Sequence, residues 1–232
     1  MRFLTAAIAR NRLLLAMRTL GGAARSDAKI PVMCGRITQK SGLGTLGLGV
    51  VSVSLLEDVV PTPRYNGAPG QEHWVIRQHP ETGQRSIDRL WWGLIPHWCK
   101  DRTGGRKPIN AKAETVASLP SFREAYERRR CLLPVDNFFE WNAIKGAPKQ
   151  PYAAGMKSGE PFALAALWEN WKRPGTEEWV GTFAVITIGA NELVGQIHGR
   201  MPVIIPPIAY DRWLMTIEPD PRDLLARSLP RR

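Results

Sequence analysis

The chain has 232 residues and a mass of 25.9 kDa, of which 44% are hydrophobic and 23% charged. This composition excludes a disordered or fibrous protein and is enough for one substantial core or two small ones. The 32 Lys and Arg residues outnumber the 21 Asp and Glu residues, giving a net charge of +11. Nucleic acid, another polyanion and an acidic membrane surface are therefore all permitted partners, and charge alone does not choose among them.

The first 33 residues differ from the rest, with six basic residues against one acidic residue and apolar runs at 3–9 and 13–17. Such a segment is typical of an organelle transit peptide, and equally of a misread upstream start codon. Because Met33 directly precedes Cys34, we favour the misread start, which predicts a cytoplasmic, nucleoid-associated bacterial protein. No apolar run reaches the roughly 18 residues that a membrane span requires. We therefore expect a leader at 1–33 and one folded domain at 34–232.

Residues 42–47, GLGTLG, match the GxGxxG pattern of dinucleotide-binding proteins. The segment that follows, VVSVSLL, has strand character, whereas a pyrophosphate site needs a helix at this point. No acidic residue stands about twenty positions further on to bind a ribose. We therefore interpret this segment as a flexible surface loop.

From Met33 onward the pattern is one of short strands broken by Pro and Gly, with a few helices. Apolar alternation at 73–79 and 85–92, on either side of ETGQ, predicts a hairpin. Residues 120–130 predict a helix, with Ser121 and Glu124 at the spacing of a capping box. Strand character returns at 131–141 and again near 150–156, 161–167 and 181–188, before two helical stretches at 208–215 and 221–229. Many strands with isolated short helices predict a single α+β domain with a curved, barrel-like, mostly antiparallel sheet.

Three cysteines, at positions 34, 99 and 131, fit a reducing compartment better than a disulfide framework. None of them forms a CxxC pair, and the four histidines are scattered, so we expect neither a metal nor another cofactor.

Cys34, in MCGRI, would carry both a free α-amine and a thiol if the chain began there. An α-amine has a pKa near 7.7 to 8.0, so about 10% of it is neutral and nucleophilic at pH 7, against about 0.04% of a lysine. The amine can condense with an aldehyde to a Schiff base, and the thiol can then close a five-membered thiazolidine ring. The alternative is a buried structural cysteine in an ordinary strand.

Three further positions could serve chemistry or structure. Asn110 follows Pro108 and could orient a substrate or form a turn. Glu140 lies in the apolar run FFEW, where an inward-facing carboxylate would have a raised pKa and could carry protons, and an outward-facing one would only be the polar half of a strand. His198 lies in a loop, where a histidine could act in catalysis or simply be hydrogen-bonded.

A set of short blocks in one order resembles the SOS response-associated peptidase (SRAP) family, from residue 33 to roughly 215. The blocks are MCGR (33–36), RYNGAP (64–69), WWGLIPHW (91–98), INAKAET (109–115), FREAYERRRCLLPVDNFFEW (122–141), KQPY (149–152), ALAALWE (163–169), ANEL (190–193) and IHGRMPVII (197–205). The resemblance implies a barrel-like α+β domain with a basic groove for single-stranded DNA. It also implies covalent trapping of abasic sites by an N-terminal cysteine and autoproteolytic removal of the preceding residues.

By the same resemblance, Cys34 is the crosslinking nucleophile, Asn110 positions the reacting end, Glu140 is the acid/base and His198 promotes ring opening or reversal. The resemblance further implies that Arg36, Lys112 and Arg200 meet phosphates and that Trp98 stacks against a base. Lys112 stands where the family usually has Arg, and Gly199 stands where it usually has Asp.

The sequence therefore favours a monomeric abasic-site sensor that crosslinks single-stranded DNA and cleaves its own leader. One alternative is a thiol peptidase acting on other proteins, with Cys34 and His198 as nucleophile and base. The other is a DNA-binding module that is inert because its leader is never removed.

Overall fold

The computed structural model describes residues 34–51, 62–79, 81–100, 107–144, 146, 148–215 and 220–226, and the backbone of two short strands within 3–4 and 15–19. The strands are β1 (Phe3–Leu4), β2 (Leu15–Thr19), β3 (Ile37–Gln39), β4 (Arg64–Gly67), β5 (Glu72–Gln78), β6 (Arg85–Trp92), β7 (Asn110–Lys112), β8 (Arg130–Val135), β9 (Asn137–Asn142), β10 (Gln150–Met156), β11 (Phe162–Lys172), β12 (Trp179–Gly189), β13 (Arg200–Pro202) and β14 (Ile204–Ile205). The helices are α1 (Leu43–Leu46), α2 (Arg123–Arg128), α3 (Tyr210–Leu214) and α4 (Arg222–Ala226), with 3₁₀ turns η2 (Val194–Gln196) and η3 (Pro207–Ala209).

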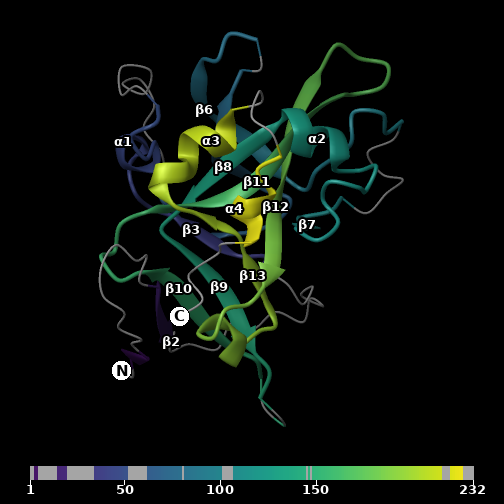
Figure 1. Ribbon diagram of the computed structural model, residues 1–232. Coiled ribbons are helices and arrows are strands. Elements are labelled where there is room, and N and C mark those ends of the chain that lie inside the picture. The colour runs from purple at the N-terminus through teal and green to yellow at the C-terminus, as the bar shows by residue number, and fades with distance from the viewer. Residues whose placement is uncertain are drawn as a thin grey trace.

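Strands β6, β5, β8, β11 and β12 form a closed ring (Figure 1). Each pairs antiparallel with the next, and a parallel pairing of β12 with β6 closes the barrel. β7 and β13 add to β12 at its C-terminal half. The predicted α+β class and barrel-like sheet are therefore confirmed, as is the hairpin, which forms from β5 and β6.

A second sheet runs in the order β1, β2, β10, β9, β3, β4 beside the barrel (Figure 1). The buried side chain of Gln39 joins β3 to the barrel. Its amide nitrogen donates to the carbonyls of Trp74, at 2.8 Å, and Pro134, at 2.7 Å, while its amide oxygen accepts the Trp74 N–H. The second sheet is thus fixed to the barrel immediately downstream of Cys34.

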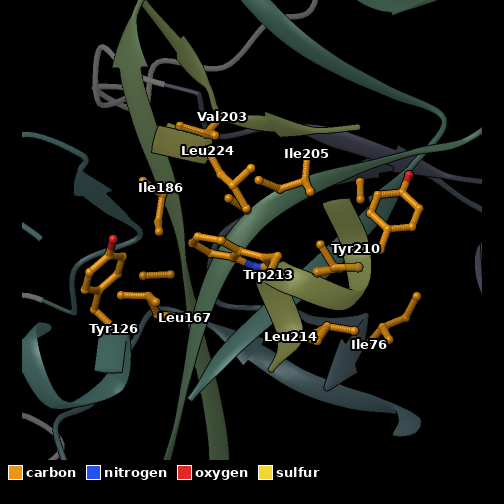
Figure 2. Close-up of a cluster of buried hydrophobic side chains, with 14 of the residues drawn as sticks. Ile76, Tyr126, Leu167, Ile186, Val203, Ile205, Tyr210, Trp213, Leu214 and Leu224 are labelled. Carbon is orange, nitrogen blue, oxygen red and sulfur yellow. The ribbon is translucent and has the colours of Figure 1, made fainter. Parts of the chain in front are cut away.

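The barrel strands are apolar on both faces because both faces are covered. On β11, Ala163, Ala165 and Leu167 pack in one cluster, and the alternate residues Leu164 and Trp168 pack in the other. The first cluster lies beneath the helices and is centred on Trp213 of α3, with Leu224, Ile186 and Tyr210 around it (Figure 2). The indole N–H of Trp213 donates to the carbonyl of Cys131 at 2.8 Å, so this large side chain is both packed and hydrogen-bonded.

Three local expectations are wrong. The segment around residue 42 is not a surface loop, because residues 43–46 form the short helix α1 with Leu43 and Leu46 buried against the core. The helix near 120 is present as α2, but its N-cap is Phe122 and it has no side-chain cap, so the capping box of Ser121 is absent. The strand expected at 131–141 is divided into β8 and β9.

Asp136 causes the division between β8 and β9. Its main-chain N–H donates to the carbonyl of Thr38 at 2.9 Å, and its carboxylate accepts the main-chain N–H groups of Lys40, at 2.7 Å, and Ser41, at 3.2 Å. The hydroxyl of Ser41 also donates to this carboxylate. These bonds let the chain leave the barrel at Asp136 and enter the second sheet as β9, the strand that carries Glu140.

Candidate active site

Cys34 lies just before β3 and is only 3% exposed. The antiparallel pairing of β3 with β9 places Ile37 opposite Phe138, and the main-chain N–H of Phe139 donates to the carbonyl of Arg36 at 2.9 Å. This register brings the next residue of β9, Glu140, beside Cys34. Glu140 is 2% exposed, so the inward-facing interpretation of FFEW holds.

The thiol and the main-chain N–H of Cys34 both donate to the Glu140 carboxylate. Burial raises the pKa of Glu140, and these two hydrogen bonds and the nearby His198 only partly offset that rise. Burial also raises the pKa of the Cys34 thiol, and the negative charge of Glu140 raises it further. The thiol therefore stays protonated at neutral pH. The Glu140 carboxylate lies beside both the sulfur and the main-chain nitrogen of Cys34 and can accept a proton from either.

His198 follows the 3₁₀ turn η2, and the side-chain oxygen of Asn191 accepts the main-chain N–H of Val194, the first residue of that turn, at 2.9 Å. The His198 ring is half-buried, and its Nδ1 lies 3.8 Å from Oε2 of Glu140. The same nitrogen faces the main-chain N–H of Arg200, at 3.2 Å, and its carbonyl, at 3.0 Å. That carbonyl also lies 3.9 Å from Sγ of Cys34, so His198, Arg200 and Cys34 meet at one point.

Asn110 begins β7, which pairs parallel to β12 with Asn110 opposite Val185. Its side-chain amide donates to the carbonyl of Cys34 at 3.3 Å. Oδ1 of Asn110 and Oε1 of Glu140 are buried acceptors without a hydrogen-bond partner among the described residues. The fold thus brings Cys34, Asn110, Glu140 and His198 together from four separate segments.

The residues expected to bind DNA have varied surroundings. Lys112 is exposed at the end of β7, and Trp98 is 56% exposed. Arg36 is half-buried and donates to the carbonyl of Gly35 at 2.9 Å. The guanidinium of Arg200 is engaged by the carboxylate of Glu114. Their roles in binding remain predictions.

The turn that carries Trp98 is anchored through the preceding residue, His97. Nδ1 of His97 lies 3.3 Å from the buried carboxylate of Glu169, and Nε2 lies 3.7 Å from Glu124. Arg129 bridges both carboxylates, at 2.9 Å and 3.0 Å. This cluster fixes the base of the turn while the indole of Trp98 stays exposed.

Sequence reasoning missed two residues of this region, Glu114 and Thr187. Both contact the guanidinium of Arg200. Glu114 lies within INAKAET, but an exposed Glu in a turn has no local signal that distinguishes it from a solvated surface charge.

Within the ranges that the structure describes, no three His, Cys, Asp or Glu side chains are grouped so as to hold a metal ion. No helix in those ranges is long and apolar enough to cross a membrane.

The model of the SOS response associated peptidase (SRAP) family matches residues 33–231. The chain belongs to the SRAP family. Two Bacillus subtilis proteins named as abasic site processing proteins are similar to it. YoqW is 36% identical over 193 residues, covering 82% of this chain and 83% of the relative, and YobE is 39% identical over 168 residues, covering 72% and 75%.

The fold of this SRAP chain is also found in solved structures. The crystal structure of a Bacteroides thetaiotaomicron protein matches with a TM-score of 0.72 and 25% identity, covering 83% of this chain and 85% of the other. A phage-related protein from Bordetella bronchiseptica matches with a TM-score of 0.64 and 30% identity, covering 85% and 90%.

Proposed function

We propose that this SRAP protein, once residues 1–33 are removed, captures abasic sites in single-stranded DNA through Cys34 in the response to DNA damage. The contact that carries the proposal is that of Cys34 with Glu140, whose carboxylate accepts both the main-chain N–H and the thiol. Both nucleophiles of a terminal cysteine would then share one proton acceptor. The names of the B. subtilis relatives, abasic site processing proteins, support the same substrate.

The chemistry joins one amine, one thiol and one aldehyde with loss of one water. The neutral α-amine of Cys34 adds to the aldehyde carbon of the opened sugar, and the resulting carbinolamine loses water to form an imine. The sulfur then adds to the imine carbon, and the thiol proton ends on the nitrogen. The product is a thiazolidine in which carbon 1 of the sugar is bonded to both nitrogen and sulfur.

Each neighbouring side chain has a task in these steps. Glu140 takes the proton that the amine loses on addition and returns it to the departing hydroxyl, which is general acid–base catalysis at hydrogen-bond distance. Asn110 holds the Cys34 carbonyl at 3.3 Å and so fixes the rotation of the terminal residue. His198, beside Glu140, assists proton transfer when the sugar ring opens.

Binding of the DNA strand is assigned to three basic side chains and one aromatic side chain. Arg36, Lys112 and Arg200 would neutralise phosphates, and Trp98 would stack on a base, which together give affinity without sequence preference. The net charge of +11 supports such a partner.

The test is crosslinking of protein that begins at Cys34 to single-stranded DNA containing an abasic site. We expect a heat-stable adduct on a denaturing gel, absent from the Cys34→Ala variant. Cys99→Ala, which removes a half-buried cysteine elsewhere in the chain, is the matched control and should form the adduct. An adduct that forms equally well with Cys34→Ala would refute the proposal.

The second activity that we propose is self-cleavage between Met33 and Cys34. Glu140 would take the thiol proton of Cys34 as the sulfur adds to the Met33 carbonyl and would pass it to the leaving nitrogen, giving a thioester that water hydrolyses. The contact of Glu140 with both atoms of Cys34 supports this route. Mass spectrometry of the purified chain should find a Cys34 terminus in the wild type and an intact leader in Glu140→Gln. An intact leader in both would refute self-cleavage.

A thiol peptidase acting on other proteins has less support. Such an enzyme needs a thiolate, produced by a lowered pKa, whereas burial and Glu140 both raise the pKa of Cys34. An inert DNA-binding module is distinguished by the same mass measurement, because it would retain its leader and form no adduct.

A further inference from the structure

Arg200 is held by an internal carboxylate in the geometry with which arginine binds phosphate. Its Nη1 donates to Oε1 of Glu114 at 3.0 Å and its Nη2 donates to Oε2 at 2.9 Å. Two parallel N–H···O bonds of this kind are also the way in which a guanidinium recognises a phosphate. The solvent-facing edge of the Arg200 guanidinium, its outer edge, is therefore occupied by the Glu114 carboxylate.

The inner edge of the guanidinium is occupied as well. Nη2 donates to the main-chain carbonyl of Thr187 at 2.7 Å, and Nε lies 3.4 Å from the Thr187 hydroxyl. Because Thr187 belongs to β12, these contacts fix the guanidinium against the barrel. Only the outer partner, Glu114, is exchangeable, since its side chain is 53% exposed whereas that of Arg200 is 21% exposed.

The main chain of Arg200 is part of the candidate active site. Its carbonyl lies 3.9 Å from Sγ of Cys34 and 3.0 Å from Nδ1 of His198. A phosphate bound by the Arg200 side chain would thus be held by the same residue whose main chain contacts Cys34 and His198. The Glu114 carboxylate, which occupies the Arg200 guanidinium, therefore affects how strongly a DNA strand binds to this side chain.

The carboxylate of Glu114 also has an alternative position. Glu114 lines a cavity of about 450 Å³ together with Arg222 of α4. A carboxylate released from Arg200 could turn into this space, although the guanidinium of Arg222 already pairs with the carboxylate of Asp220. The bond from Arg200 lowers the pKa of Glu114, so the carboxylate is ionised at neutral pH and competes as an anion.

We propose that Glu114 is an internal competitor for phosphate at Arg200. This inference rests on the proposed binding of single-stranded DNA. In the free protein Glu114 neutralises Arg200, and a strand binds by exchanging a phosphate for that carboxylate. Glu114 therefore weakens the hold on undamaged DNA, which favours release from intact strands before Cys34 reacts.

The test is the affinity of the full chain for an undamaged single-stranded oligonucleotide as a function of salt. We expect Glu114→Gln to bind about three- to fivefold more tightly at low salt, the size of one exposed charge pair. The slope of log K against log[salt] should stay unchanged, because the bound strand makes the same phosphate contact at Arg200 in both proteins.

Glu178→Gln is the matched control, because it makes the same charge change in another Arg–Glu pair. Glu178 lies 2.7 Å from Arg173 and is 51% exposed. It precedes β12, whereas Arg200 pairs with Gly189 at the far end of that strand, roughly 30 Å away. In an Arg200→Gln background, Glu114→Gln should have no more effect than Glu178→Gln.

Three results would overturn the inference. Weaker binding by Glu114→Gln would mean that Glu114 orients Arg200 for DNA. Equal effects of Glu114→Gln and Glu178→Gln would mean that only net charge matters, and a persistent effect without Arg200 would mean that Glu114 acts elsewhere. If the wild-type chain crosslinks abasic DNA and the variants give any of these results, only this inference is refuted. A chain that binds strands but never crosslinks refutes the proposed capture instead.

Discussion

Replacing Glu140 by Gln separates proton transfer from every other contribution of this side chain. Gln is nearly the same size, and its amide oxygen can still accept the N–H of Cys34, but it cannot take a proton. General acid–base catalysis contributes about 10²–10⁴-fold, so we expect crosslinking to slow by about 100-fold, which is about 2.7 kcal/mol of barrier. The assay is the single-turnover rate of adduct formation by protein beginning at Cys34.

The pH dependence of the same variant provides a second measurement. Burial raises the pKa of Glu140, and the protonated acid cannot accept the proton of the amine, so the wild-type rate should fall as pH is lowered through that pKa. Glu140→Gln should lack this acidic limb. Equal rates for the two proteins, or an unchanged acidic limb in the variant, would refute the assigned role.

Stability should change in the opposite direction to activity. Since the folded-state pKa of Glu140 lies above its unfolded value, the folded protein binds this proton more tightly, and the stability it provides is lost as pH rises through the folded pKa. At pH 7 the neutral Gln should therefore give a melting temperature at or above that of the wild type. Glu169→Gln is the control, because it removes a buried carboxylate that pairs with Arg129 at 2.9 Å. We expect it to melt lower than the wild type.

Three further predictions concern stability and binding. Burial lowers the pKa of His73 to about 4, so about 3 kcal/mol of folding stability should be present above pH 6.5 and lost as pH falls from 6.5 to 4. Urea unfolding across this range measures that loss. The His73→Phe variant should show a flatter dependence of the free energy of unfolding on pH. Gly67→Ala should cost about 1–3 kcal/mol by thermal denaturation, because its Cβ would lie 2.4 Å from Cε1 of His73. Gly199→Ala meets nothing within 4 Å and should leave the melting temperature unchanged, so equal losses would contradict the packing. Lys112→Gln should reduce the salt slope of single-strand binding by about 0.7, and an unchanged slope would exclude a phosphate contact.

Local patterns were sufficient for the elements whose cause is local. The hairpin of β5 and β6 follows from alternation on either side of a turn, and the fold class follows from the number of short strands. The break at Asp136 could not be predicted, because it depends on Lys40 and Ser41, which are remote in sequence. The leucines of α1 were misjudged for a related reason, since only the tertiary fold shows that they are buried.

The candidate site was predicted through resemblance more than through residue patterns. Position alone left Asn110, Glu140 and His198 each with a structural explanation, and only the motif blocks selected them together. The pairing of β3 with β9 supplies what the sequence lacks, because it places Glu140 against Cys34. Glu114 was missed because its partner Arg200 is remote in sequence, on β13.

The burial of Cys34 has a consequence for its side reactions with small aldehydes. An exposed terminal cysteine would condense with formaldehyde and free sugars, and each adduct would occupy one molecule. At 3% exposure the sulfur is shielded from bulk solvent, and its carboxylate partner is in place only after two distant strands have paired. This shielding is a property of the finished fold, because it depends on the pairing of β3 with β9.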